Sequence, residues 1–281
     1  MTLLEAWLLT PLSFDFMRRG LVMAVLVGAV CAVLSCFLVL KGWALLGDAI
    51  SHAVLPGVVI ASALGLPLAT GAFAAGLFCA FATGHLKETS RLKEDTVMAI
   101  VFSGLFALGL VLMVALPSRD LHVSHVLFGN MLGVTWADVA ESGLVAVLVL
   151  AIMLLKRRDF MLFCFDPAHA RAIGLDVRLL HYGLLVLVAL AIVAALKAVG
   201  VILVIAMLIA PGAVGFILAR RFETMLPIAV TVAVVSSVLG TIASFPLDVA
   251  PGPLIVVLQA LAFALALGWK RLAAPATRLG A

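Results

Sequence analysis

Charged residues are scarce in this chain of 281 residues: they make up 11% of it, and there is a single Tyr. Hydrophobic residues make up 65%, whereas an average soluble domain has about 45–50% apolar and about 25% charged residues. So little polar surface cannot cover a soluble globule, which excludes a cytosolic enzyme, a secreted disulfide scaffold and a disordered chain. The net charge of +4 does not indicate a nucleic-acid partner, because the charges stand in short clusters between apolar runs. The composition predicts a polytopic helical membrane protein.

Sequence motifs of catalysis and of disulfide frameworks are also missing. The four cysteines, Cys31, Cys36, Cys79 and Cys164, form no CxxC pair, and we interpret them as small apolar packing residues. The chain has no GxxxxGK[ST] loop for ATP, no HExxH and no GxSxG. We therefore expect no enzyme activity and no nucleotide bound by a P-loop.

Long apolar runs cover most of the chain. A helical span needs about 20 mostly apolar residues, and this length predicts an all-α fold with eight or nine transmembrane helices in a single transmembrane domain, residues 1–281. The apolar runs are 17–40, 48–66, 68–85, 96–116, 138–155, 179–197, 199–219, 225–245 and 252–269. The pairs 48–66/68–85 and 179–197/199–219 are joined so tightly that each is a helical hairpin or a bent element. The segment 117–137 is expected to be a loop with a short re-entrant or interfacial helix. Its His122 and His125 are interpreted as solvated loop residues, and the alternative is that they bind a metal or receive a carrier protein.

The distribution of Lys and Arg predicts the orientation, because cytoplasmic loops carry an excess of both. An outside N-terminus with nine spans places 14 of the 18 Lys and Arg residues inside. Arg18 and Arg19 would stand outside and favour the reverse, so the loss of one span near the N-terminus stays an alternative.

Asp48 and His52 are the most informative ionisable pair. Four residues apart, they lie on one face of a helix. A helix that starts at Lys41 would put His52 about 16 Å along it, near the middle of the hydrocarbon core. An imidazole and a carboxylate there suit a divalent metal such as zinc or manganese. The alternative is an Asp–His hydrogen bond that only packs the helices.

Two Pro-Gly pairs interrupt apolar runs. Pro56 removes the donor for the carbonyl of His52, and Gly57 lets a neighbouring backbone approach, as in transport proteins that present backbone atoms to ions. Pro211 and Gly212 predict a kink or an unwound turn. Either pair would act as a hinge in gating, or would only give the helix a fixed bend.

The basic loop at about 157–178 contains a short bounded helix. Asp166 is expected to be its N-cap, Pro167 its first residue and Gly174 the residue that ends it. A helix so short does not stabilise itself, so we expect it to dock on a cytoplasmic partner, with Ala170 on the docking helix. An interfacial helix that lies on lipid headgroups is the alternative.

These residues together resemble a known family. The run GDAISHAVLPG, residues 47–57, is similar to a signature of permeases from zinc and manganese ABC importers. Residues 14–19, the helix 166–174 and the stretch 197–211 resemble the same permeases, although the family is Ala-rich after Pro211. The resemblance implies the type II ABC importer fold and a place in the bacterial cytoplasmic membrane, in contact with lipid.

The resemblance further implies a complex. It would contain a second copy of the chain, two cytoplasmic ATPase subunits and an extracytoplasmic metal-binding protein. Asp48 and His52 would contact the metal, and the helix with Asp166, Pro167, Ala170 and Gly174 would couple the permease to the ATPase. The metal (zinc or manganese, with ferrous iron as a third choice) would be cargo rather than a permanently bound cofactor.

Two other classes of function remain. A secondary transporter, ATP-independent or proton-coupled, would be expected to have repeated halves and more intramembrane carboxylates than Asp48 and Glu141. An intramembrane enzyme would need a nucleophile or a metal with a base, which Asp48 and His52 alone do not supply.

Overall fold

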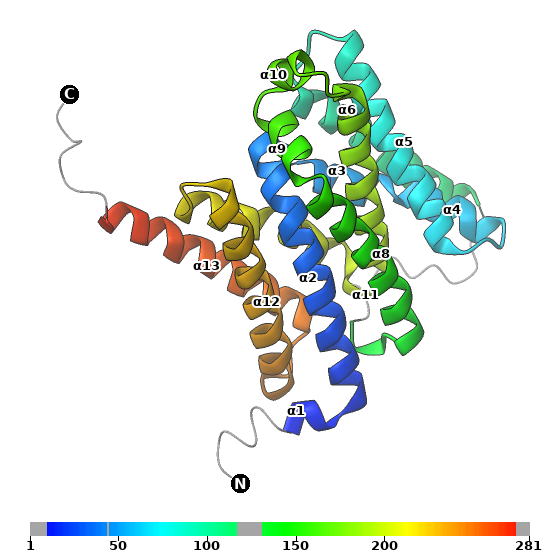
Figure 1. Ribbon diagram of the computed structural model, residues 1–281. Coiled ribbons are helices and arrows are strands. Elements are labelled where there is room, and N and C mark those ends of the chain that lie inside the picture. Colours follow the sequence, from blue (N-terminus) through cyan, green and yellow to red (C-terminus); the bar gives the residue numbers. More distant parts are fainter. Residues whose placement is uncertain (1–9, 44, 117–130, 274–281) are drawn as a thin grey trace.

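The computed structural model describes residues 10–43, 45–116 and 131–273, where every regular element is a helix (Figure 1). The elements are α1 (Thr10–Ser13), α2 (Asp15–Lys41), α3 (Leu46–Ala53), α4 (Leu55–Ala63), α5 (Leu68–Thr89), α6 (Glu94–Ala115), the 3-10 turn η2 (Met131–Gly133), α8 (Trp136–Leu155), α9 (Arg157–Phe165), α10 (Pro167–Ala172), α11 (Val177–Leu218), α12 (Phe222–Leu247) and α13 (Pro251–Ala273). The predicted all-α fold is confirmed. Most of the segment 117–137, including His122 and His125, lies outside the described residues.

Eight helical segments of the described chain are long and apolar enough to cross a membrane, and α3 with α4 counts as one of them. A ninth apolar helix, Leu203–Leu218, is shorter. Its 16 residues extend about 24 Å at 1.5 Å per residue, less than the roughly 30 Å of a hydrocarbon core. The predicted range of eight to nine spans therefore corresponds to eight full-length spans and one short helix.

The short ninth helix exists because α11 turns back at Gly200, whose φ of 76° and ψ of 167° are not helical. Before this residue the chain runs from His181, which packs on Trp43, to Ala194, whose carbonyl accepts a hydrogen bond from Ser142. After it the chain returns, and Gly212 contacts Ser35 in the second half of α2. The predicted tight junction between 197 and 199 is thus a helical hairpin with a glycine at its turn.

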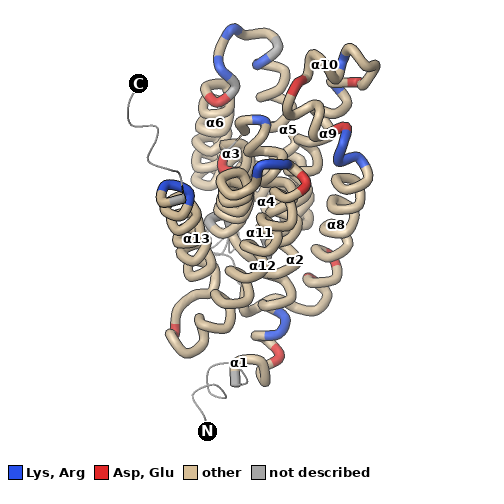
Figure 2. The backbone as a smooth tube through the Cα atoms, turned by 60° about the vertical axis from the view of Figure 1, so that its left-hand side comes forward, with Lys and Arg blue, Asp and Glu red and all other residues tan. Residues whose placement is uncertain are grey.

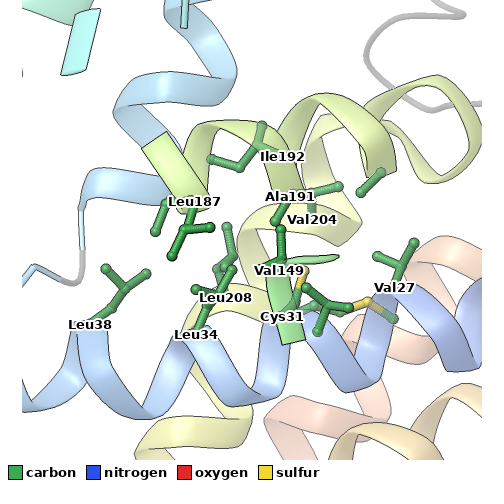
Figure 3. Close-up of a cluster of buried hydrophobic side chains, with 14 of the residues drawn as sticks. Val27, Cys31, Leu34, Leu38, Val149, Leu187, Ala191, Ile192, Val204 and Leu208 are labelled. Atoms are coloured by element: carbon green, nitrogen blue, oxygen red, sulfur yellow. The ribbon is translucent and has the colours of Figure 1, made fainter. Parts of the chain in front are cut away.

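The long helix α2 forms the centre of the bundle, and 72% of its most apolar window is buried. Figure 3 shows side chains of α2 facing those of α8 and both arms of α11. They are Val27, Cys31, Leu34 and Leu38 from α2, Val149 from α8, and Leu187, Ala191, Ile192, Val204 and Leu208 from α11. Because lipid tails are as apolar as these side chains, close van der Waals packing rather than burial from water holds such an interface together. All four cysteines are buried and free, as predicted.

The backbone at Pro211 differs from the expectation. The dihedral angles of Pro211 and Gly212 stay helical, and within α11 only Gly200 departs from them. The hydroxyl of Ser35 on α2 accepts a hydrogen bond from the Gly212 N–H at 2.9 Å and donates one to the Ile209 carbonyl at 3.1 Å. This side chain satisfies the backbone on both sides of the proline, so the predicted unwound turn is absent there and the interruption lies 11 residues earlier, at Gly200.

Charge separates the two ends of the bundle. Figure 2 shows Lys and Arg concentrated at the end where α9 and α10 lie, and a smaller basic cluster near α1 at the other end. The large cluster includes the basic residues of the α5–α6 and α8–α11 connections, and the small one contains Arg18 and Arg19. By the excess of Lys and Arg on the cytoplasmic side, the end with α9 and α10 is the expected cytoplasmic end.

Candidate metal-contacting site

The helix that carries Asp48 and His52 begins later than the sequence predicts. The central helix α2 ends at Lys41, where Gly42 takes a left-handed conformation (φ 78°) and its N–H bonds to the carbonyls of Leu38 and Val39. A separate helix, α3, begins at Leu46. The expected start at Lys41 is therefore wrong, because a glycine C-cap ends α2. His52 lies six residues into α3, about 9 Å along its axis rather than 16 Å.

Asp48 and His52 do face each other along α3. The distance from His52 Nε2 to Asp48 Oδ1 is 3.9 Å, and the two side chains are 32% and 34% exposed. Their separation exceeds that of a direct hydrogen bond. Two donors on one tetrahedral metal with bonds of about 2.0–2.1 Å stand roughly 3.4 Å apart. A shift of about half an ångström would thus let both atoms contact one ion.

Two aromatic rings of α6 form the wall beside the imidazole. The ring centroids of Phe102 and Phe106 lie 6.2 and 5.5 Å from that of His52. The opposite face of α3 is buried against other helices: Leu208 of α11 lies against Gly47, and Gly76 of α5 lies against Ile50. This packing leaves the Asp48–His52 face of α3 partly open.

One copy of the chain supplies few metal ligands. Across the described residues, no group of three or more His, Cys, Asp and Glu side chains is placed to hold a metal ion. Asp48 and His52 thus offer two donors, whereas transition metals take four to six.

The interruption near Pro56 is present. The boundary between α3 and α4 lies at Val54, which keeps helical dihedral angles (φ −67°, ψ −26°), and Pro56, which has no N–H to donate, stands in the first turn of α4. Glycines surround this break: a Cβ on Gly57 would overlap the carbonyl oxygen of Gly71 on α5, and one on Gly109 of α6 would lie 2.9 Å from the Pro56 nitrogen. Gly57 therefore does permit a close backbone approach, as the sequence predicted. Whether these residues gate a path stays a prediction.

The short helix α10 forms with the predicted boundaries. Asp166 Oδ1 accepts hydrogen bonds at 3.0 Å from the N–H groups of Ala168 and His169, and Pro167 is the first helical residue. Gly174 has a φ of 88°. Next to it, the Leu175 N–H bonds to the Ala170 carbonyl at 3.0 Å, which is the pattern of a glycine-terminated helix.

Ala170, one of the predicted coupling residues, does not face outward. It is fully buried, and α10 packs against α9 and α11. The exposed apolar residues around α10 are Phe165, 80% exposed, and Ile173, 58% exposed. These two residues, which sequence reasoning missed, are the exposed apolar side chains that flank α10, near Arg171 in the sequence.

A contact cluster that the sequence did not reveal joins α9 to the start of α3. The ammonium of Lys41 lies 4.1 Å from the ring centroid of Phe163 on α9, and the ring of His181 lies 5.1 Å from Trp43 and 6.2 Å from Phe163. Trp43 is buried in the link between α2 and α3. The signal in the sequence was a lone Trp between a Lys and the Asp48 helix, but nothing in the sequence indicated its partners on α9 and α11.

These features define a class of protein: a multi-pass helical membrane protein with ionisable residues beside a broken span and a bounded helix at its basic end. Residues 13–270 match the ABC 3 transport family, and the chain belongs to it. It is therefore the membrane permease of a metal-type ABC importer, in the bacterial inner membrane, and not a catalytic enzyme.

Named relatives cover nearly the whole chain. The chelated iron transport system membrane protein YfeD of Yersinia pestis is 59% identical over 95% of this chain and 90% of its own length. The manganese transport system membrane protein MntB of Synechocystis is 49% identical over 93% and 85%. Among solved structures, PsaBC from Streptococcus pneumoniae in complex with Fab is 36% identical, covers 94% of this chain and 95% of its own, and superposes with a TM-score of 0.83.

Proposed function

We propose that this permease imports manganese or ferrous iron, with zinc as a third cargo, and that Asp48 and His52 contact the ion on its path. The observation that carries the proposal is the Asp48–His52 pair, 3.9 Å apart on one face of a broken span. One nitrogen and one carboxylate donor suit borderline divalent metals. The names of the relatives in Yersinia pestis and Synechocystis favour iron and manganese.

A second copy of the chain completes the coordination. Two copies that meet with their α3 helices together offer two carboxylates and two imidazoles, which suffice for a transient tetrahedral or six-coordinate stop. The partly open Asp48–His52 face of α3 supports this arrangement, because ionisable groups in a membrane span are costly unless they face a partner or a polar path.

Separate subunits would supply the energy and deliver the ion. Two cytoplasmic ATPases would dock at the basic end, against α10 and its flanking residues Phe165 and Ile173, and an extracytoplasmic metal-binding protein would release the ion at the end near α1. The well-defined caps of α10 support its role as the coupling helix, since a helix of six residues needs a partner to transmit force.

The test is uptake of Mn²⁺ and Fe²⁺ by cells that carry the chain with its ATPase and binding protein. Asp48→Asn and His52→Gln are expected to abolish uptake while the protein stays in the membrane at normal amount. The matched controls are Asp95→Asn and His85→Gln, the same chemical changes at two exposed residues near the basic end. Normal uptake by both site variants would reject the site, and uptake that persists with an inactive ATPase would support the secondary transporter instead.

A further inference from the structure

A small groove at the basic end lies between the first turns of α9 and α12. Its volume is about 300 Å³, and its lining residues are Arg157, Arg158, Met161 and Leu162 from α9 and Phe222, Glu223 and Leu226 from α12. Its floor belongs to the core, because Phe222 packs edge-on against Phe37 of α2 with ring centroids 5.0 Å apart. The groove thus has an apolar floor and a charged rim.

The arginines of the rim have no acidic partners. Among the described residues, neither Arg157 nor Arg158 forms an ion pair, and the same holds for Arg220 and Arg221 just before Phe222. Glu223 lines the groove but is not within ion-pair distance of any of them. Four guanidinium groups and one carboxylate leave the neighbourhood of the groove with excess positive charge.

A second groove, between α8, α9 and α11, differs from the first in that its charged residues already have partners. Its volume is about 560 Å³, and its charged lining residues are Lys156, Asp159 and Asp176. Lys156 is already paired with Asp159 at 3.2 Å, and Asp176 accepts hydrogen bonds from the N–H groups of Arg178 and Leu179. This larger groove therefore offers apolar surface without unpaired positive charge.

The groove lined by Arg157 and Arg158 lies at the ends of two membrane spans, where the hydrocarbon core meets the headgroups. The span α8 ends at Leu155, two residues before Arg157, and the span α12 begins at Phe222. Leu155 is 84% exposed and Leu218, at the end of α11, is 42% exposed, as expected of side chains that face lipid tails. The apolar floor thus adjoins lipid-facing surface, and the arginines stand at the level of the headgroups.

From this placement we propose that the groove binds one anionic diacyl phospholipid. Its phosphate lies between Arg157 and Arg158, since guanidinium groups match phosphate oxygens in pairs. Its first acyl carbons lie on Met161, Leu162 and Leu226. Basic pockets between transmembrane helices on the cytoplasmic side bind acidic headgroups in this way. The lipid would contact α9, directly before the α10 helix, and so would hold α9 against α12.

The experiment measures lipid binding to the full chain, purified in detergent and stripped of lipid. Native mass spectrometry follows titration with dioleoyl phosphatidylglycerol and, separately, with dioleoyl phosphatidylethanolamine. The wild-type chain is expected to bind one phosphatidylglycerol in preference to phosphatidylethanolamine. The double variant Arg157→Gln/Arg158→Gln should lose roughly tenfold or more in affinity, since two charges near an acidic surface are removed. Arg157→Lys/Arg158→Lys keeps both charges but loses the paired N–H groups, so its affinity should lie between those of the wild type and the Gln variant.

The matched control is Arg171→Gln/Arg178→Gln, which removes two unpaired arginines at the same end but outside the groove, and it should bind lipid like the wild type. A second variant, Met161→Trp, fills the apolar floor without any change of charge and should also weaken binding. Equal losses in the groove variant and the control would overturn the proposal in favour of general attraction to the basic end. Unchanged lipid binding with lost ATPase co-purification would assign the groove to the protein partner. None of these readouts depends on transport.

Discussion

Gly57 on α4 and Gly71 on α5 touch through their backbones, and each leaves no room for a Cβ of the other. We expect Gly57→Ala to separate the two helices and to lower the unfolding free energy by about 1–3 kcal/mol, the usual cost of overpacking. The control is Gly143→Ala on α8, where the nearest atom to an added Cβ, Leu26 Cδ1, is 3.7 Å away. Thermal unfolding in detergent measures both. Equal melting temperatures for the two variants would contradict the predicted clash.

For single residues, the sequence predicted local roles, such as an N-cap or a side-chain pair, better than the direction in which a side chain faces. It identified Asp48 and His52 as neighbours and Asp166 as an N-cap from their spacing alone, because both patterns are local. It placed Ala170 on a docking surface, where the structure buries it. The direction in which a residue of a short helix faces depends on α9 and α11, and contacts between distant segments leave no local pattern in the sequence.

The short helix α10 yields a pair of contrasting substitutions. Ala170→Asp places a carboxylate in a fully buried position and should destabilise the protein by several kcal/mol, since an unpaired charge is buried. Ile173→Asp changes a residue that is 58% exposed and should leave stability within about 0.5 kcal/mol. If α10 docks on the ATPase, Ile173→Asp alone should abolish co-purification of the ATPase from a stable permease. Retained co-purification and uptake would contradict docking through this face.

The junction of Lys41, Trp43, Phe163 and His181 lies between α10, the proposed coupling helix, and α3, which carries Asp48 and His52. Because Phe163 precedes α10 by four residues and Trp43 precedes Asp48 by five, a displacement of α9 would reach α3 through these rings. We expect Trp43→Phe and Phe163→Leu each to lower uptake while ATP hydrolysis continues. Because both rings contact Lys41 and His181, a double-mutant cycle on stability should give a coupling of at least about 0.5 kcal/mol, as for residues in one contact network.

The control for the junction is Phe216→Leu, the same change as at Phe163 but on α11, at a side chain that is 54% exposed. If Trp43→Phe and Phe163→Leu both keep uptake coupled to ATP hydrolysis at the level of this control, the rings have only a packing role. The Asp48 and His52 side chains are untouched in all of these variants, so a loss of uptake would not reflect a loss of ligands.

At the scale of elements, apolar periodicity and length identified every span, since about 20 apolar residues in a row have few other interpretations. The turn of α11 was predicted only as a tight junction between the runs 179–197 and 199–219. The kink or unwound turn was assigned to Pro211 and Gly212, and Gly200 was not singled out. The structure turns at Gly200 and keeps a helix through Pro211, because Ser35, 176 residues away, bonds the backbone next to it. Hydrogen bonds from Ser35, which is distant in the sequence, therefore keep the helix continuous at Pro211.

For the whole molecule, the number of ligands argues for two chains around one ion. The described part of one chain has no group of three or more His, Cys, Asp and Glu side chains placed to hold a metal, and the proposed pair of Asp48 and His52 with solvent alone would bind an ion weakly. A pair of chains doubles the donors without any new residue, as symmetric assemblies do. The proposed path therefore predicts one ion for every two chains.

Titration calorimetry with Mn²⁺ on the purified permease measures this stoichiometry directly. We expect about 0.5 ion per chain for the wild type and loss of the binding heat for His52→Gln, with His85→Gln as the control for an exposed histidine. A tandem fusion of one wild-type and one His52→Gln copy should bind at least roughly tenfold more weakly than a wild-type tandem, since the lost imidazole is one of four donors and a lost ligand contact of about 1.4 kcal/mol corresponds to tenfold. One ion per chain, or equal affinity in the two tandems, would place the ion within a single chain and reject the shared site.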